Sequence, residues 1–175
     1  MAERWKPSVT VAAIASRPRP GGTGAADEYL LVEEETPEGL RLNNPAGHLD
    51  PGESPAEAVV REALEETARA FAPERLVGIY LARFERPATG EDVTYLRFAF
   101  AGSVGAADPA RPLDAGIVRT LWMTLDELRA SRARHRSSLV LRCIEDAAAG
   151  LALPLDRIVT DASVYSPEVK RGSAT

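Results

Sequence analysis

Short apolar runs alternate along the chain with polar segments rich in glycine and proline. Runs of β-branched and aliphatic residues predict strands, because these side chains suit a pleated, half-buried surface. The segment at 17–26, rich in proline and glycine, predicts a flexible loop that joins the first two strands into a hairpin. The expected strands lie at 8–15, 28–33, 40–42, 75–84, 94–101 and 120–123.

Helix signals are clearest after the third of these strands. Ser54 fits an N-cap, Pro55 fits the first helical position, and Glu57 completes a capping box. We therefore expect a helix that runs to about Ala70. The similar pattern at Thr124 predicts a second helix, and an apolar run ended by glycine predicts a third. These two helices are expected at 124–134 and 138–149.

This order of elements predicts one α/β (α+β) domain over residues 1–160, in which helices cover a central mixed sheet. The length of 175 residues suits a single domain. A polar tail at 161–175 is expected to be mobile. The single cysteine, Cys143, lies in an apolar helical pattern, which favours a core residue over a disulfide.

Charge and hydropathy exclude several classes of protein. The net charge is −5 and the pI about 5.2, which argues against nucleic-acid binding through a large basic surface. No stretch approaches the roughly 20 apolar residues of a membrane span, and the first residues lack the apolar core of a signal peptide. The expectation is a cytoplasmic protein with no membrane partner and a small-molecule substrate.

Three glutamates carry the candidate chemistry. Glu62, Glu65 and Glu66 stand at i, i+3 and i+4, so one turn of helix aims three carboxylates at one point. Their mutual repulsion would be relieved by a hard divalent cation such as Mg²⁺, with Mn²⁺ as an alternative. The carbonyl of Gly47, in a turn expected at 47–53, is a further candidate ligand. Another face of the helix, with Val59 and Ala63, is expected to pack on the sheet.

The spacing around these glutamates resembles the Nudix box, G-x5-E-x7-R-E-U-x-E-E-x-G-U, where U is a bulky aliphatic residue. There are three departures, at Ala63, Ala68 and Arg69. Ala68 replaces a glycine at the helix end, so we expect an altered exit turn and an intact metal site. The matching positions are Gly47, Glu53, Arg61, Glu62, Glu65 and Glu66.

The resemblance implies a Nudix-type α/β/α sandwich and a metal-dependent hydrolase. In that family the positions of Glu65 and Glu66 usually hold metal, and the position of Glu62 binds metal or serves as the base. The position of Arg61 orients a glutamate. Glu53 would be a supporting carboxylate, tied to Arg61 or to metal-bound water. The expected catalytic residues are therefore Glu62, Arg61 and Glu53.

Flanking segments are similar to the NudJ-type phosphatase branch of the family, at 5–12, 31–34, 44–49, 95–98 and 138–140. That branch removes phosphate from nucleoside di- and triphosphates and from thiamine pyrimidine pyrophosphate. Two alternatives stay open. One is an ADP-sugar or dinucleotide pyrophosphatase, and the other is a Nudix-fold nucleotide-binding sensor without catalysis. The sequence leaves the oligomeric state open.

Several further residues have a functional and a structural interpretation. Asp114 either reaches the site or the enzyme manages without it, and Glu91 and Asp92 are weaker candidates. His48 is expected to support the site or contact phosphate more than to act as a base. Four basic residues could meet phosphate but are expected at the surface, namely Lys6, Arg17, Arg83 and Arg97. Four aromatic residues are expected mainly in packing, namely Tyr29, Phe84, Tyr95 and Trp122.

Overall fold

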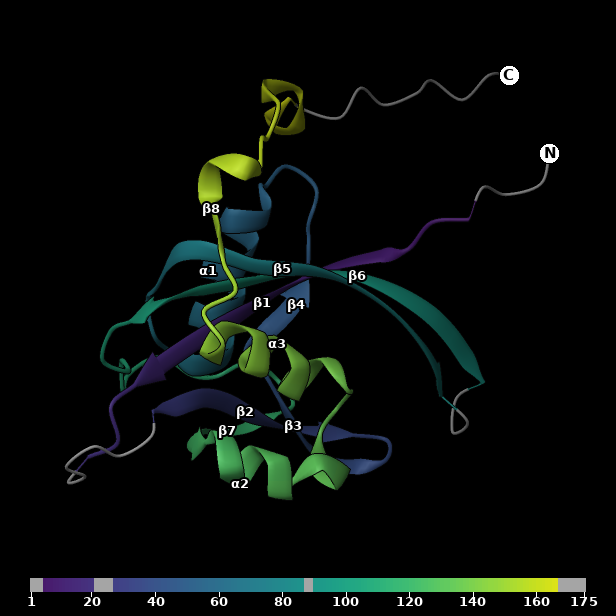
Figure 1. The fold of residues 1–175 in the computed structure, drawn as a ribbon. Coiled ribbons are helices and arrows are strands. Elements are labelled where there is room, and N and C mark those ends of the chain that lie inside the picture. The colour runs from purple at the N-terminus through teal and green to yellow at the C-terminus, as the bar shows by residue number, and fades with distance from the viewer. Residues whose placement is uncertain (1–4, 21–26, 87–89, 167–175) are drawn as a thin grey trace.

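The computed structural model describes residues 5–20, 27–86 and 90–166. Within these ranges the chain forms a mixed sheet with helices on both faces (Figure 1). The strands are β1 (Ser8–Arg17), β2 (Glu28–Thr36), β3 (Gly39–Asn43), β4 (Ala46–His48), β5 (Phe71–Arg86), β6 (Glu91–Val104), β7 (Ile117–Thr124) and β8 (Leu153–Pro154). The helices are α1 (Pro55–Thr67), α2 (Leu125–Ala130) and α3 (Leu139–Ala148), with 3₁₀ turns η1 (Arg132–Arg134), η2 (Leu155–Arg157) and η3 (Ala162–Tyr165).

Strand β1 is the centre of the sheet. The strand order is β3-β2-β1-β6-β5-β8, while β4 pairs with β1 and β7 pairs with β2. β1 runs parallel to β6, with Thr10 opposite Arg97, and antiparallel to β4, with Val11 opposite Gly47. Its far end forms the expected hairpin with β2, where Arg17 stands opposite Glu28. The mixed sheet predicted from the sequence is therefore confirmed.

Alternation along β1 builds a core on each face of the sheet. Val11 and Ala13 pack with the apolar face of α1, which includes Val59. Ala12 and Ile14 point the other way, toward α3. Because side chains alternate across a strand, one short apolar run supplies both cores. Figure 1 shows α1 and α3 on opposite sides of the sheet, as an α/β/α sandwich requires.

Helix α1 begins as predicted and ends earlier. The Ser54 hydroxyl accepts from the Glu57 backbone N–H, and the Glu57 carboxylate accepts from the Ser54 N–H at 2.7 Å. The helix stops at Thr67, and Ala68 adopts the left-handed conformation with φ 53°. The expectation of an altered exit turn is wrong, because alanine makes the same turn that a glycine would favour. This early end lets β5 start at Phe71.

The glycine-rich segment before α1 starts as a strand, not as the predicted turn. Gly47 and His48 belong to β4, which pairs with β1. The turn comes later, around Asp50 to Gly52, where Gly52 has φ 87°. Pairing with a central strand satisfies the backbone groups of β4 and outweighs its local turn preference.

The remaining predictions concern loops and chain ends. The helix expected to reach Arg134 ends at Ala130 and is followed by η1. Parts of the expected loops, at 21–26 and 87–89, lie outside the described residues. In the tail, Tyr165 of η3 donates a hydrogen bond from its hydroxyl to Glu57 at 2.9 Å. Among the described residues no helix is long and apolar enough to cross a membrane.

Candidate active site

Arg61 gathers three carboxylates at the middle of α1. Its Nε and Nη2 donate to the two carboxylate oxygens of Glu53 at 3.0 and 2.7 Å. Its Nη1 donates to Glu62 at 2.8 Å and to Glu65 at 3.0 Å. The planar guanidinium presents its donors in a fixed fork, so it sets the orientation of each of these carboxylates. The expected tie between Glu53 and Arg61 is present in the structure.

The same arginine fastens the preceding loop to the helix. Arg61 Nη2 donates to the backbone carbonyl of His48 at 3.0 Å, and the Asp50 N–H donates to Glu53 at 2.8 Å. The Arg61 hydrogen bonds hold the pKa of Glu53 below its usual range, despite partial burial. They also raise the pKa of Arg61. Glu53 is therefore an ionised carboxylate that orients Arg61.

Glu66 lies on the inner side of the helix, against β4. Its side chain accepts from the Ala46 N–H at 2.8 Å, and the residue is only 9% exposed. Burial, together with the nearby carboxylates of Glu62, Glu34 and Asp114, raises its pKa to about 8, although the Ala46 hydrogen bond lowers it. Burial likewise raises the pKa of Glu62, while Arg61 lowers it. The carboxylates of Glu62 and Glu66 are thus held at buried positions that disfavour their ionised forms.

Gly47 is required by the close approach of Glu62. A Cβ at position 47 would lie 2.1 Å from the Glu62 carboxyl carbon and 2.2 Å from both of its oxygens. The Glu62 carboxylate therefore rests directly on the backbone of β4. This contact brings the Gly47 backbone against the Glu62 carboxylate, and the predicted role of the Gly47 carbonyl as a ligand stays a prediction.

The donor set suits a hard cation. Glu62, Glu65 and Glu66 supply carboxylate oxygens and Gly47 a carbonyl, which are the ligand types that Mg²⁺ prefers. Within the described residues, however, no three acidic, histidine or cysteine side chains surround a common point closely enough to enclose an ion. The contacts explain why, because Arg61 draws Glu62 and Glu65 toward itself while Glu66 turns to the Ala46 N–H. The donor types suit a cation, but Glu62 and Glu65 would have to turn from Arg61 before they could meet one.

Asp114 lies beside the site, at the end of the loop that follows β6. Its backbone N–H donates to the carbonyl of Glu65 at 3.0 Å, and the neighbouring Asp108 N–H donates to the carbonyl of Ala68 at 2.8 Å. Its carboxylate is near enough to raise the pKa of both Glu62 and Glu66. Asp114 is exposed, so it adds negative charge at the solvent side of the cluster.

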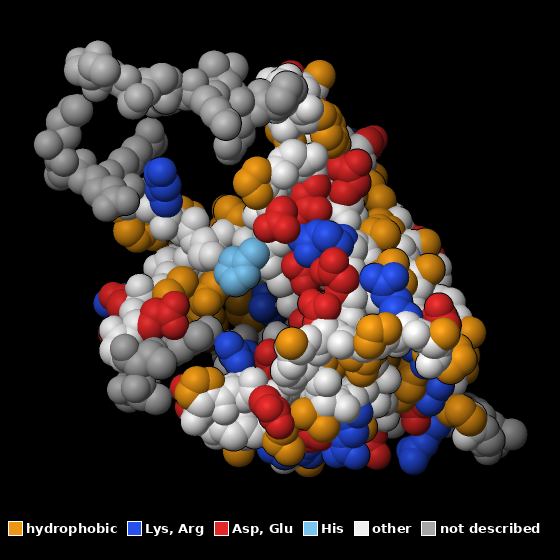
Figure 2. All heavy atoms as spheres, turned by 180° about the vertical axis from the view of Figure 1, so that it is seen from behind, with side chains coloured by type: hydrophobic (Ala, Val, Ile, Leu, Met, Phe, Trp, Pro, Cys, Tyr) orange, Lys and Arg blue, Asp and Glu red, His pale blue; other side chains and the backbone are white. Residues whose placement is uncertain are grey.

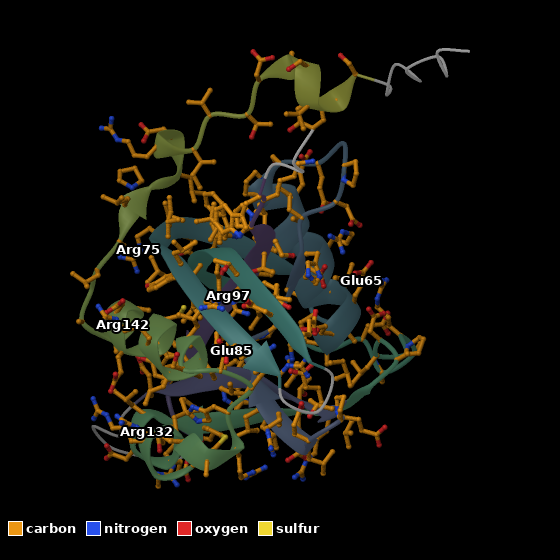
Figure 3. The ribbon with its side chains drawn as sticks, turned by 90° about the vertical axis from the view of Figure 1, so that its right-hand side faces the viewer. Glu65, Arg75, Glu85, Arg97, Arg132 and Arg142 are labelled. Carbon is orange, nitrogen blue, oxygen red and sulfur yellow. The ribbon has the colours of Figure 1, made fainter. Side chains whose placement is uncertain are left out.

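A pocket of about 370 Å³ opens on the other side of β4. Ala46 and Gly47, whose backbone meets Glu66 and Glu62, also line this pocket. Figure 2 shows acidic side chains gathered around a basic one beside a hollow in the surface. In Figure 3, Glu65 stands on α1, and Arg97 lies over the sheet on β6. Strand β4 is therefore a wall shared by the carboxylate cluster and the pocket.

The pocket contains residues that the sequence did not place. Arg97, expected at the surface, is 9% exposed and lines the pocket. Phe84 and Tyr95, expected mainly in packing, also line it. A signal was present in the alternation of Tyr95, Arg97 and Ala99, because residues two apart share a face and Ala99 is in the core. Glu34, in the same pocket, was missed altogether.

Other sequence candidates have structural partners. Glu57 caps α1, Cys143 and Tyr29 are buried in the core, and burial raises the pKa of the Cys143 thiol to about 11. The ring of Trp122 packs under Arg17, whose guanidinium carbon is 4.2 Å from the ring centroid. Two of the expected surface charges, Lys6 and Arg83, are exposed. Arg83 forms an ion pair at 2.7 Å with Asp92, one of the weaker site candidates, which is also exposed.

Comparison with known proteins identifies the family. A family model described as the NUDIX domain matches residues 7–142. Phosphatase NudJ of Escherichia coli is 34% identical over 156 residues, which is 88% of this chain and 92% of the relative, and the Shigella boydii protein is equally similar. A solved NUDIX hydrolase from Nitrosomonas europaea is 49% identical, with a TM-score of 0.76 over 89% of this chain and 98% of that one.

More distant structures share the fold. The NUDIX domain of Shewanella oneidensis NrtR, solved with ADP ribose, is 17% identical, with a TM-score of 0.63 over 85% of this chain and 90% of that one. The matched region spans β1 to α3 and contains the helix, the carboxylate cluster and the pocket wall described above. The chain belongs to the NUDIX domain family and is a Nudix hydrolase.

Proposed function

We propose that this Nudix hydrolase removes phosphate from a nucleoside di- or triphosphate or a related diphosphate, such as thiamine pyrimidine pyrophosphate. Mg²⁺ is the proposed ion, and Mn²⁺ is the proposed substitute. The carboxylate cluster of Glu62, Glu65 and Glu66 carries the proposal, because it lies across β4 from a pocket of nucleoside size. The similarity to phosphatase NudJ over most of the chain supports release of phosphate.

Each residue of the cluster has a separate task in this proposal. Glu65, Glu66 and the Gly47 carbonyl hold the ion, and Glu62 either joins them or accepts a proton from the attacking water. Arg61 holds Glu62 and Glu65 in place, and Glu53 holds Arg61. A bound divalent ion would neutralise phosphate oxygens and assist attack by water.

The raised pKa of Glu62 suits both roles. At neutral pH the Arg61 hydrogen bond favours the ionised carboxylate, while burial makes that carboxylate a stronger proton acceptor than an exposed one. The contact with Gly47 limits where the carboxylate can lie. This restriction limits how far Glu62 has to move to reach a reactive geometry.

A substrate panel tests the proposal. Nucleoside diphosphates, triphosphates, ADP-sugars and dinucleotides are incubated with Mg²⁺ or Mn²⁺, and orthophosphate, pyrophosphate and nucleotide products are measured. The proposal predicts orthophosphate from diphosphates, and ¹⁸O from labelled water should enter orthophosphate rather than the nucleotide. Two monophosphates from an ADP-sugar or dinucleotide, with no orthophosphate, would indicate the pyrophosphatase alternative. Absence of turnover across the panel would favour a sensor domain.

A further inference from the structure

The floor of the 370 Å³ pocket is unusual because buried polar atoms on it lack hydrogen-bond partners. Within the described residues these are Thr10 Oγ1, Asn43 Oδ1, Glu34 Oε1, and both Nε and Nη1 of Arg97. They come from four strands, β1, β3, β2 and β6, and Arg97 is 9% exposed. Buried donors and acceptors are normally paired, since an unpaired group loses its hydration without compensation. Their concentration in one pocket indicates a polar ligand.

The charge of the pocket argues against phosphate as that ligand. Three arginines line it, namely Arg41, Arg97 and Arg136, and three glutamates balance them, namely Glu34, Glu38 and Glu85. A phosphate would meet carboxylates as well as guanidiniums, so a balanced lining offers it little net attraction. A neutral group with its own donors and acceptors suits such a lining. The phosphates of a substrate then fall across β4, at the carboxylate cluster.

The unpaired atoms have almost no exposed surface, so the side chains of Arg97 and Glu34 must turn toward the pocket they line to bond to a ligand. These two side chains specify both kinds of hydrogen bond. Arg97 offers two free donors, so the ligand must present an acceptor to it. Glu34 offers a free acceptor oxygen, so the ligand must present a hydrogen-bond donor to it. On the ligand, this donor must lie beside the acceptor that faces Arg97. Two aromatic rings of the lining, Phe84 and Tyr95, have centroids 5.8 Å apart and offer faces on which a flat heterocycle stacks.

We propose that this pocket selects an amino-substituted nucleobase, with Glu34 accepting from the exocyclic amino group and Arg97 donating to the adjacent ring nitrogen or carbonyl. The proposal rests on the proposed function for the phosphate end of the substrate. Cytosine and adenine present an amino group beside a ring nitrogen. Uracil and hypoxanthine present a carbonyl in place of the amino group, and a carbonyl repels the Glu34 carboxylate.

Binding of nucleoside monophosphates tests this selectivity without divalent ion and without turnover. Isothermal titration calorimetry compares CMP with UMP, and AMP with IMP. The wild type should bind the amino member of each pair at least about tenfold more tightly, the scale set by one mismatched buried hydrogen bond. Glu34→Gln adds an amide donor at the same place, so it should lower affinity for CMP and raise affinity for UMP.

Two comparisons separate recognition from damage to the fold. Glu35→Gln removes the same charge from the next residue of β2, where the side chain is exposed, and should leave both ratios unchanged. Arg97→Lys keeps the charge but loses the forked donors, so it should weaken binding of both members of each pair. A gain of UMP affinity in Glu34→Gln cannot arise from misfolding.

The outcomes also distinguish this inference from the proposed function. Equal affinities within each pair, ratios unchanged by Glu34→Gln, or no binding of any of the four compounds would overturn the inference. Hydrolysis of diphosphates in that case would leave the proposed function standing. Conversely, selective binding that Glu34→Gln reverses would support the inference even if the substrate panel showed no turnover.

Discussion

The carboxyl carbon of Glu62 lies 2.1 Å from the position that a Cβ on Gly47 would occupy. The backbone of Gly47 has no left-handed φ, so its need for glycine is one of space rather than of conformation. Because glycine has no side chain, Glu62 of helix α1 can lie directly against the backbone of strand β4. Activity should therefore depend on residue 47 more strongly than stability does.

Gly47→Ala tests this contact. The added methyl group must push the Glu62 carboxylate aside, and the end of a flexible side chain moves at low cost. We expect kcat to fall by roughly tenfold or more, on the scale of a misplaced catalytic group, while the free energy of unfolding changes by less than about 1 kcal/mol. Steady-state kinetics and urea unfolding measure the two effects. Unchanged kcat would show that the position of Glu62 is unimportant.

Metal binding should stabilise the protein through the carboxylates of α1. A ligand that binds the folded state raises its melting temperature. Mg²⁺ or Mn²⁺ should therefore raise the melting temperature of the wild type, and much less that of Glu66→Gln, which keeps an oxygen for the Ala46 N–H but loses the charge. Differential scanning fluorimetry over a metal titration gives the result. Equal shifts in the two proteins would remove Glu66 from the ligand set.

Two glutamates of α1 should differ sharply in their effect on catalysis. Glu62→Gln removes a charge and a proton acceptor, and kcat should fall by about 10²-fold or more. Glu57→Gln removes a charge from the capping box and should lower kcat by less than about tenfold, because Glu57 binds Ser54 and Tyr165 instead of the cluster. Circular dichroism checks that both variants are folded. Similar losses would contradict this division of the helix.

Glu33 should make stability depend on acid pH. The residue is 3% exposed, and hydrogen bonds from Arg119, with a further contribution from Arg134, lower its pKa. A lowered folded-state pKa means that the unfolded chain binds the proton more strongly. The contribution of Glu33 is therefore complete above the unfolded pKa of about 4.3 and is lost as pH falls through the folded value.

Comparison of wild type with Glu33→Gln measures that contribution. The difference in unfolding free energy should be about 1.5 kcal/mol at pH 7, on the scale of a charged hydrogen bond, and should shrink below about pH 4. Urea unfolding between pH 7 and pH 3 provides the data. Glu35→Gln, an exposed neighbour, should show no such trend. A difference in unfolding free energy between wild type and Glu33→Gln that stays constant from pH 7 to pH 3 would contradict the proposed role of the ionised Glu33.

The start of α1 and its carboxylates could be predicted because their signals are local. Ser54, Pro55 and Glu57 encode the cap within four residues, and the i, i+3, i+4 spacing is fixed by helix geometry. The end of the helix could not be predicted in the same way. Ala68 takes a left-handed conformation that is unfavourable for alanine, and tertiary contacts such as the Asp108 N–H bond to its carbonyl hold it there.

Strand β4 and the pocket depend on contacts between distant segments. The Gly47-His48 pair resembles a turn until it is paired with Thr10 and Val11 on β1. Arg97 resembles a surface charge, because a charged residue in a strand usually faces solvent. Only the packed structure shows that the face of β6 that carries Arg97 is covered. The sequence therefore predicted the carboxylates that lie on one helix, α1. It did not predict the pocket, whose lining comes from several strands.

The parallel pairing of β1 with β6 has a consequence for the order in which the protein folds. Strand β1 is the centre of the sheet, yet its partner β6 is synthesised only after α1 and β5. Pairing of distant segments is slow, because the loop between them must close first. The pocket floor joins Thr10 to Arg97 across this pair. A nascent chain that ends before β6 thus carries every carboxylate of α1 but has no surface on which to receive a base.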